Sequence, residues 1–332
     1  MKIDNIVLDH GEGGAATDRL VREVFLSRLG SPDVLEDGAV VRGCDRIVMT
    51  TDTFVVHPLV FPGGDIGRLA ISGTVNDLAV MGAEPRYLTA GFVLEEGLEI
   101  RLLEAMIDSM AMTAAEAGVS IVTGDTKVVH RGEADSMYVN TSGVGLLPPG
   151  RRLTPAGCLP GDRVIVSGYV GDHGIAVMIA REGFGISVDL SSDCQPLGDL
   201  AAALLDAAPG TRCMRDPTRG GLATTLIDFC RASATGMRIR EVDIPVRAQV
   251  EVACSVLGLD PLYVACEGRL VAVVPPEQSG AALSALRANR KGRDAALIGE
   301  VVDSPKGLVV ETSVGGLRPM VLLEGAQLPR IC

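Results

Sequence analysis

The stretch Asn76-Asp77-Leu78-Ala79-Val80-Met81-Gly82-Ala83-Glu84-Pro85 marks the place where a helix ends and a strand begins. Asp65 is suited to cap the start of that helix, and the apolar residues after it predict a helix from about 66 to 81. Gly82 suits the position just past the helix end, and Pro85 prevents continuation. Asp77 lies inside this apolar helix. Because an unpaired buried charge is costly, its carboxylate needs a partner such as a metal ion, an Arg or an N–H group.

Strands and helices on both sides of this stretch predict an α+β fold. The expected strands are 87–93, 119–123 and 137–147, and the expected helix at 98–117 is closed by Gly118. A short apolar strand runs into Thr50-Thr51-Asp52, and another ends in Gly124-Asp125-Thr126-Lys127. We therefore expect Asp52 and Asp125 each to lie where a strand meets a turn.

The chain divides near Pro148-Pro149-Gly150, where proline and glycine are concentrated. A length of 332 residues suits two domains. We predict an N-terminal domain over 1–150, a second α+β domain over 151–320 and a tail over 321–332. In the second domain, Met214-Arg215-Asp216-Pro217-Thr218-Arg219-Gly220-Gly221 precedes a predicted helix, and glycines at a helix start with Thr and Arg beside them suit anion binding. A plain turn is the alternative.

Composition and charge exclude several classes of protein. The formal net charge is −12, aromatic residues are 3% of the chain and Trp is absent, which argues against a nucleic-acid-binding protein. No run approaches about 18 apolar residues, and the N-terminus lacks the apolar core of a signal peptide. We therefore expect a cytoplasmic protein without a membrane span.

The 8 cysteines include no Cys-x-x-Cys pair, and the 4 histidines show no metal-ligand spacing, which argues against a zinc site. The chain ends on Pro329-Arg330-Ile331-Cys332, after a segment with Gly and Pro but no helical or strand period. This pattern predicts a mobile arm with a nucleophilic thiol at its tip. A frayed terminus that happens to end in cysteine is the alternative.

Two features of the first domain point to a nucleotide. His10-Gly11-Glu12-Gly13-Gly14 is a glycine-rich loop whose N–H groups can approach an anion, and Thr17 or Asp18 is expected to cap a helix after it. A flexible entry loop is the alternative. Hard cations such as Mg²⁺ prefer oxygen ligands and bridge to phosphates. The carboxylates that suggest such a site stand at expected strand or helix ends: Asp37, Asp52, Asp77 and Asp125.

Together these motifs resemble the ATP-using superfamily of aminoimidazole ribonucleotide synthetase, selenophosphate synthetase and thiamine-monophosphate kinase. The resemblance spans nearly the whole chain and rests on the order of five motifs: Glu36-Asp37-Gly38-Ala39, Thr50-Thr51-Asp52, Asn76 to Pro85, Gly124-Asp125-Thr126 and Asp216 to Gly221. Within the superfamily, the glycine-rich loop, Lys127 and the closing Pro-Arg-Ile-Cys resemble the HypE family of hydrogenase maturation proteins. Glu12 stands where that family is expected to carry Ser.

The resemblance implies a fold, cofactors and a set of site residues. The fold would have two α+β domains, with the N-terminal domains dimerising through their sheets and a flexible tail at the C-terminus. ATP would lie between N-terminal sheets and domains, with Mg²⁺ on the aspartates named above. The implied nucleotide-binding residues are Gly11, Gly13, Gly14, Asp37, Asp52, Asn76, Asp77, Asp125, Thr126 and Arg219.

The implied reaction uses Cys332 as the carrier of a carboxamide, loaded by a HypF-like carbamoyltransferase. ATP would phosphorylate the amide oxygen, and loss of phosphate would leave a thiocyanate. The cyanide would then pass to iron in a HypC–HypD-like complex, as a ligand of [NiFe]-hydrogenase. Loss of the amide proton needs a base, for which Glu267 is the first candidate and Lys127 the second. Alternatively, Lys127 only contacts phosphate and Glu267 only pairs with Arg269.

Two other functions remain open from the sequence. A small-molecule kinase or synthetase of the same superfamily would act on a free substrate and would not need Cys332. A regulatory ATP-binding module would bind nucleotide without hydrolysis and would tolerate changes at Asp77 and Asp125.

Overall fold

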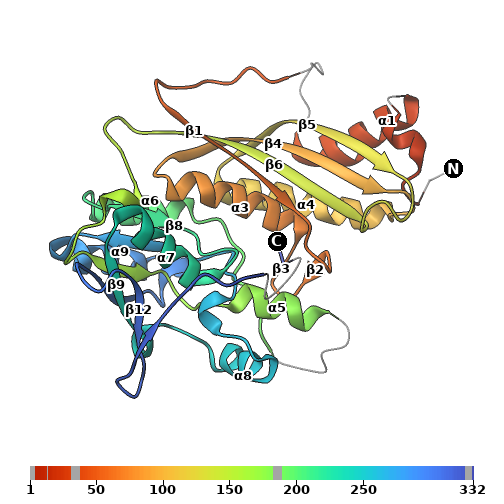
Figure 1. Ribbon diagram of the computed structural model, residues 1–332. Coiled ribbons are helices and arrows are strands. Elements are labelled where there is room, and N and C mark those ends of the chain that lie inside the picture. The colour runs from red at the N-terminus through yellow and green to blue at the C-terminus, as the bar shows by residue number, and fades with distance from the viewer. Residues whose placement is uncertain (1–3, 13, 31–37, 182–188, 326–330) are drawn as a thin grey trace.

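The computed structural model describes residues 4–12, 14–30, 38–181, 189–325 and 331–332 (Figure 1). Gly13 and Asp37, both predicted to bind nucleotide, lie outside the described residues. The described strands form a four-stranded sheet, a seven-stranded sheet and a small two-stranded sheet.

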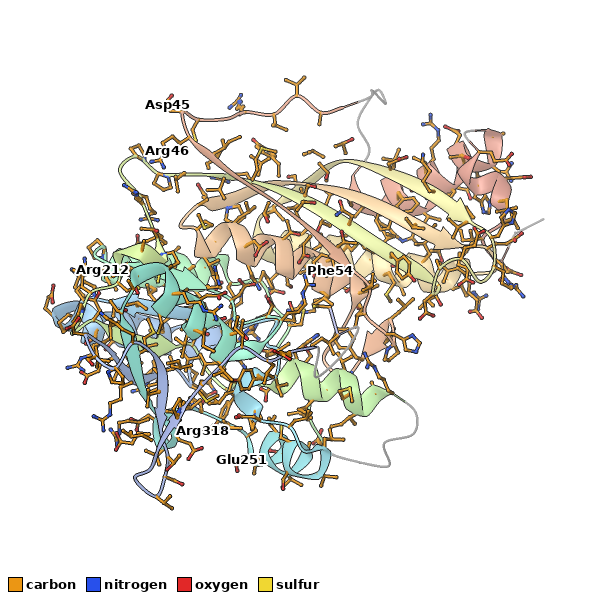
Figure 2. All side chains as sticks on the ribbon, in the orientation of Figure 1. Asp45, Arg46, Phe54, Arg212, Glu251 and Arg318 are labelled. Carbon is orange, nitrogen blue, oxygen red and sulfur yellow. The ribbon has the colours of Figure 1, made fainter. Side chains whose placement is uncertain are left out.

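The four-stranded sheet has the strand order β1-β6-β4-β5. Its strands are β1 (Ile47–Phe54), β4 (Glu84–Glu95), β5 (Ser120–Val129) and β6 (Met137–Leu146). Helices α3 (Ile66–Val80) and α4 (Ile100–Ala117) lie along one face of this sheet (Figure 1). Phe54, labelled at the end of β1 in Figure 2, packs directly over Gly73 of α3.

The predicted caps of α3 are confirmed. The Asp65 carboxylate accepts a hydrogen bond from the Arg68 N–H at 2.9 Å. At the other end, Gly82 adopts a left-handed φ of 78°, and the N–H groups of Gly82 and Ala83 donate back to Ala79 and Leu78. This paired arrangement satisfies carbonyls that a helix end leaves free, and it turns the chain directly into β4.

The expectation that β1 and β5 end at their carboxylates was wrong. β1 continues through Asp52 to Phe54 because all eight of its residues pair with β6. β5 continues through Asp125 to Val129 because it pairs with β4 in parallel. Gly124 permits this pairing, since a Cβ there would lie 2.4 Å from the Ala90 carbonyl oxygen. Asp52 and Asp125 are therefore side chains on the faces of the sheet.

The helical segment after the glycine-rich loop starts earlier than predicted. Gly14 is the N-cap, and α1 (Ala15–Leu20) begins before Thr17 and Asp18. The segment continues as η2 (Val21–Leu26), with π-helical geometry, and α2 (Ser27–Leu29). The preceding turn is η1 (Leu8–Gly11).

The seven-stranded sheet lies below the first in Figure 1, with the order β13-β12-β9-β11-β7-β10-β8. Its strands are β7 (Arg163–Val166), β8 (Cys213–Arg215), β9 (Gly236–Arg240), β10 (Val271–Val274), β11 (Ala296–Val302), β12 (Gly307–Glu311) and β13 (Leu317–Pro319). The helices that accompany it are α5 (Asp172–Ala180), α6 (Gly198–Ala207), α7 (Gly221–Ser233), α8 (Ala248–Leu257) and α9 (Ser279–Ala288). Short elements complete the fold: β2 (Val60–Phe61), β3 (Gly64–Asp65), η3 (Pro155–Gly157), η4 (Glu241–Asp243), η5 (Pro261–Tyr263), η6 (Pro276–Gln278) and η7 (Arg290–Gly292).

The two sheets are joined through α3. Ala79 and Val80, near its C-terminal end, are buried in a core shared with Leu197 and Leu200 at the start of α6. The same helix carries Asp77, so the packing places this carboxylate between the two sheets. Within the described residues, no helix is both long enough and apolar enough to cross a membrane.

Candidate active site

The last two residues of the chain lie inside the protein. Ile331 is 5% exposed and belongs to the core that includes residues of both sheets' helices. Its carbonyl oxygen lies 2.7 Å from Nε2 of His173, which is fully buried on α5. Cys332 is partly buried. The docked end gives the thiol one defined environment.

Glu267 is the nearest titratable partner of this thiol. The Glu267 side chain is 2% exposed, and a hydrogen bond joins it to Cys332. Burial, the negative charge of Glu267 and this hydrogen bond raise the pKa of the Cys332 thiol well above its usual range, against the opposing charge of Arg219. One carboxylate oxygen of Glu267, Oε1, has no hydrogen-bond partner among the residues that the structure describes. Arg269 pairs with Asp172 and Asp193 instead, so the alternative of a Glu267–Arg269 pair is not what the structure shows.

Three aspartates surround the thiol and Glu267. Asp77 accepts a hydrogen bond from the Thr50 hydroxyl at 2.7 Å, and Asp52 accepts one from the Thr53 N–H at 2.9 Å. Burial raises the pKa of both carboxyls. Burial and the charges of Asp77 and Asp52 raise the pKa of Asp216 to about 7. Together with Glu267, these carboxyls form a concentrated negative site.

Neighbouring carboxylates also raise the pKa of Glu267. Burial raises its pKa well above the usual range, and four aspartates add to the effect: Asp216, Asp193, Asp52 and Asp77. A cation in this site would relieve the repulsion, because an opposite charge favours the ionised form of each carboxyl. Arg219, exposed before α7, already acts in this direction on Asp52 and Cys332.

Asn76 has a different role from the predicted one. Its side-chain amide donates to the carbonyls of Gln195 and Glu267, both at 3.2 Å, and its oxygen accepts from the Leu197 N–H at 2.8 Å. The residue is fully buried. Its polar groups therefore hold the backbone beside Glu267, and the structure gives no amide group that faces a nucleotide.

Asp125 and Lys127 lie on the other face of the N-terminal sheet. Across the four strands, Asp125, Gly91, Asn140 and Thr53 lie in one row of the register and therefore share one face of the sheet. Asp52 is the neighbour of Thr53 on β1, so its side chain points to the opposite face, which α3 covers. Three strand spacings separate β5 from β1, which is roughly 14 Å. The Lys127 ammonium lies 3.1 Å from the Asp125 carboxylate, and this hydrogen bond lowers the Asp125 pKa.

The glycine-rich loop lies beside β5. A Cβ on Gly11 would lie 2.8 Å from the Val128 nitrogen, so only glycine permits this approach, whereas a Cβ on Gly14 would meet open space. A cavity of about 750 Å³ lies beside β5 at the edge of the sheet, lined by Thr17, Phe25, Gly124, Asp125 and Thr126 among others. A second cavity of about 370 Å³ opens between the domains and is lined by Thr50, Asp77, Arg215 and Asp216.

The predicted metal ligands do not converge within one chain. Asp52 and Asp77 share the α3 face, while Asp125 lies on the opposite face. Among the described residues, no group of three His, Cys, Asp or Glu side chains is placed to hold a metal ion. Mg²⁺ commonly takes one or two carboxylates and completes its shell with water and phosphate oxygens. Asp52 and Asp77 meet that requirement.

Sequence reasoning did not assign three residues that the structure places at the site. Asp216 lies in a motif that the sequence singled out only for its glycines and Arg219. His173 lies in the first turn of α5, and Asp193 lies in the segment before α6. Their roles depend on contacts between segments far apart in the chain, which no local pattern records.

Comparison with known proteins assigns the fold and the family. Residues 35–147 match the model of the AIR synthase related protein N-terminal domain, and 160–311 match its C-terminal domain. The carbamoyl dehydratase HypE of Azotobacter vinelandii is 49% identical over 99% of this chain and 97% of its own length. This comparison covers the site and the C-terminal tail alike.

Solved structures agree. A hydrogenase maturation protein HypE in complex with ATP is 43% identical, covers 98% of this chain and 99% of its own, and has a TM-score of 0.94. A HypE–HypF complex contains a chain that is 42% identical to this one. The match covers 93% of this chain and 99% of the other, with a TM-score of 0.81. Both identity and coverage are high over the full chain. The chain therefore belongs to the HypE family of hydrogenase maturation enzymes, within the AIR synthase related proteins.

Proposed function

We propose that this chain uses ATP to dehydrate a carboxamide carried on Cys332 to a thiocyanate. The amide oxygen attacks the γ-phosphorus of ATP and releases ADP. The amide nitrogen then loses its protons, the C–O bond breaks, and phosphate leaves with the former amide oxygen. The balance is one carboxamide and one ATP to one thiocyanate, ADP and phosphate. Phosphorylation is needed because an amide oxygen by itself is a poor leaving group.

The observation that carries this proposal is the docked thiol. Cys332 ends a long polypeptide tail, yet it is hydrogen-bonded to a buried glutamate among aspartates. A cysteine without a role would have no reason to occupy an interior site crowded with carboxyls, since burial of several carboxyls is costly.

Glu267 is the base in this account. A raised pKa makes the ionised carboxylate a stronger base towards an amide N–H than an ordinary glutamate, and a cation held among the neighbouring carboxyls would favour that ionised form. Its free oxygen Oε1 is available to accept that proton. Lys127 is bonded to Asp125 on the other face of the sheet, so it serves this thiol only if another chain brings it there.

The nucleotide and its metal occupy a site that two copies complete. The cavity of about 750 Å³ beside β5 carries Asp125 and Thr126, whereas Asp52 and Arg219 act on the Cys332 thiol and Asp77 acts on Glu267. On the outer face of β1, Ile47 is 47% and Met49 is 68% exposed, which suits pairing with a second sheet. Mg²⁺ held by Asp52 and Asp77 would neutralise charge on the phosphates.

The partners follow from the reaction. A HypF-like carbamoyltransferase would load the thiol, as the HypE–HypF complex of a relative supports. A HypC–HypD-like complex that carries iron would accept the cyanide. ATP and a reduced thiol are both needed, and these are the conditions of the cytoplasm.

The oxygen atom of the carboxamide tests the chemistry. The protein is loaded with ¹⁸O-labelled carbamoyl groups and given one equivalent of ATP, and the released phosphate is analysed by mass spectrometry. The account predicts that the label enters phosphate in proportion to the thiocyanate formed. If thiocyanate forms while all of the label appears in water, the amide oxygen is not phosphorylated and the mechanism is wrong.

A further inference from the structure

His173 has two hydrogen-bond partners and no exposed surface. Its Nε2 lies 2.7 Å from the Ile331 carbonyl oxygen, and its Nδ1 lies 2.8 Å from the Ser192 hydroxyl. The ring meets Phe61 edge-on at 5.4 Å. Burial lowers the pKa of His173, so the imidazole is neutral near pH 7. These contacts fix both the position and the tautomer of the ring.

The tautomer follows from the partners. The Ile331 carbonyl can only accept a hydrogen bond, so Nε2 carries the proton and donates it. Nδ1 of the neutral ring then accepts from the Ser192 hydroxyl. The same hydroxyl oxygen accepts from the Cys194 N–H at 3.0 Å. The chain of donors therefore runs from Cys194 through Ser192 and His173 to the tail.

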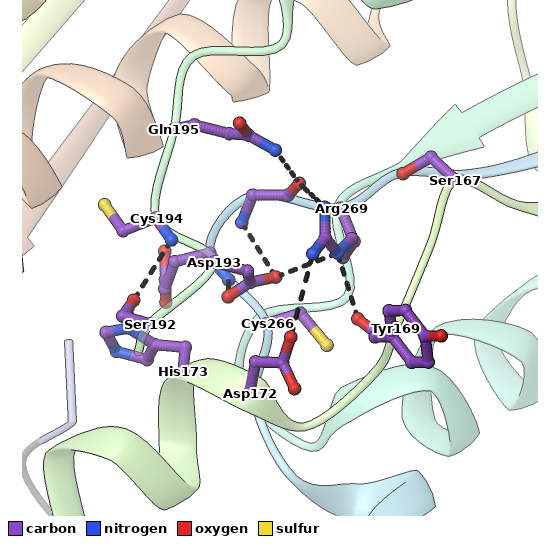
Figure 3. A network of polar contacts seen from close by, with 12 residues as sticks. Ser167, Tyr169, Asp172, His173, Ser192, Asp193, Cys194, Gln195, Cys266 and Arg269 are labelled. Carbon is purple, nitrogen blue, oxygen red and sulfur yellow. Dashed lines mark hydrogen bonds and ion pairs between the residues drawn. The ribbon is translucent and has the colours of Figure 1, made fainter. Parts of the chain in front are cut away.

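The segment that carries Ser192 also holds Glu267. The next residue, Asp193, accepts hydrogen bonds from the N–H groups of Glu267 at 3.1 Å and Gly268 at 3.3 Å. Arg269 lies against the Asp193 carboxylate, and the network is shown in Figure 3. Ser192 therefore fixes the tail through His173, and its neighbour Asp193 fixes the backbone of Glu267.

We propose that His173, held by Ser192, is a latch that binds the penultimate carbonyl of the tail and so positions the Cys332 thiol beside Glu267. His173 is a positioning residue, because its ring nitrogens contact the Ile331 carbonyl and the Ser192 hydroxyl and act on the thiol only through the tail. This role rests on the proposed function only for the identity of the group that Cys332 carries. The latch itself concerns where the thiol lies, and it can be measured without any reaction.

The first experiment measures how accessible the Cys332 thiol is. Wild type, His173→Phe, His173→Gln and Ser192→Ala are treated with limiting iodoacetamide, and alkylation is followed peptide by peptide. Phenylalanine keeps the ring beside Phe61 but donates nothing, and the glutamine amide can donate to the same carbonyl. Cys44 is exposed on the N-terminal domain and serves as the reference thiol in every sample.

We expect Cys332 of His173→Phe to react roughly fivefold faster relative to Cys44, the size expected for loss of one hydrogen bond. The alkylation rate of Cys332 should also rise in Ser192→Ala, and in His173→Gln it should lie close to the wild-type rate. Equal Cys332 rates in wild type and His173→Phe, with both proteins folded by circular dichroism, would overturn the latch.

The second experiment separates loading from dehydration. In single turnover with carbamoylated protein, His173→Phe should convert the carboxamide more slowly by a similar factor, while loading by the carbamoyltransferase is unchanged or faster. A general folding defect would slow both steps together and would not be rescued by His173→Gln. If thiol accessibility shifts as expected but no variant, wild type included, forms thiocyanate, the latch stands and the proposed function fails.

Discussion

The environment of Cys332 in the docked position bears on how the proposed reaction is divided into steps. In the docked position its pKa is raised by burial and by Glu267, so the sulfur is neutral and a weak nucleophile. A free thiol with a pKa of about 8.5 is a better acceptor of a carbamoyl group. In the proposed mechanism, loading takes place on an undocked tail, and dehydration takes place in the docked position, where Glu267 and the aspartates lie.

Glu267→Gln should load a carboxamide normally and then stall before thiocyanate. Glutamine keeps the shape of the side chain but cannot accept the amide proton, so we expect the dehydration rate to fall by at least 100-fold, the usual size of a general-base contribution. Single-turnover conversion is followed by mass spectrometry.

Glu251→Gln is the matched control, because Glu251 lies on the exposed face of α8 (Figure 2). Wild-type conversion in Glu267→Gln would move the base to another residue, with Lys127 as the next candidate.

At the scale of elements, those helix ends that are set by capping residues could be predicted from the sequence. The limits of α3 and α4 follow from one capping aspartate and two glycines in left-handed conformations, all visible in the sequence. The lengths of β1 and β5 were not predictable in this way. Polar residues such as Thr51 and Asp125 suggested turns, but pairing with β6 and β4 overrides that preference.

In the candidate site, too, some residues could be predicted from the sequence and others could not. Cys332, Glu267, Asp52 and Asp77 were named from motifs, and the structure brings them together. His173 and Asp193 were not named, because their roles arise from contacts between segments more than 70 residues apart in sequence.

The α3 cap has a measurable contribution. Asp65→Ala removes the acceptor for the Arg68 N–H and should lower the free energy of unfolding by about 1 kcal/mol. Asp65→Asn keeps a capping oxygen and should stay close to wild type. Urea unfolding at pH 7.5 measures both. An alanine variant as stable as the asparagine variant would show that the cap contributes little.

Asp172 at the start of α5 predicts a pH dependence. Burial, with the charge of Asp193, raises its pKa from 3.8 to about 6 despite two arginines nearby. A carboxyl with a raised folded-state pKa stabilises the fold below its unfolded pKa, and this contribution is lost as pH rises through about 6. Asp172→Asn removes the titration.

We therefore expect the stability of Asp172→Asn relative to wild type to increase by about 1–2 kcal/mol between pH 5 and pH 7.5. Urea unfolding at the two pH values gives the difference, and Asp303→Asn, an exposed substitution, is the control. A constant difference between Asp172→Asn and wild type at both pH values would contradict the raised pKa.

At the scale of the whole molecule, the proposal divides the nucleotide site between two copies of the chain. Asp125 lies on the outer face of the sheet and Asp77 lies between the domains. If a second copy joins them, each variant Asp77→Asn and Asp125→Asn is inactive alone, but mixed dimers contain one site with both aspartates. Statistical exchange of subunits should then restore roughly a quarter of wild-type ATP turnover.

Subunits are exchanged in mild denaturant, and activity is compared with each variant treated alone. Exchange of either variant with itself is the control. No recovery in verified mixed dimers would place Asp77 and Asp125 in a site made by a single chain.

The most direct test of the central claim is the intact mass of the protein. Wild type and Cys332→Ser are incubated with a HypF-like carbamoyltransferase, carbamoyl phosphate and only as much ATP as loading consumes, and the loaded protein is then isolated and given fresh ATP. The account predicts a carbamoyl adduct on wild type that loses one water only when ATP is added, and no adduct on Cys332→Ser. An adduct that stays unchanged with ATP, or ATP turnover on a free substrate that is equal in both proteins, would contradict it.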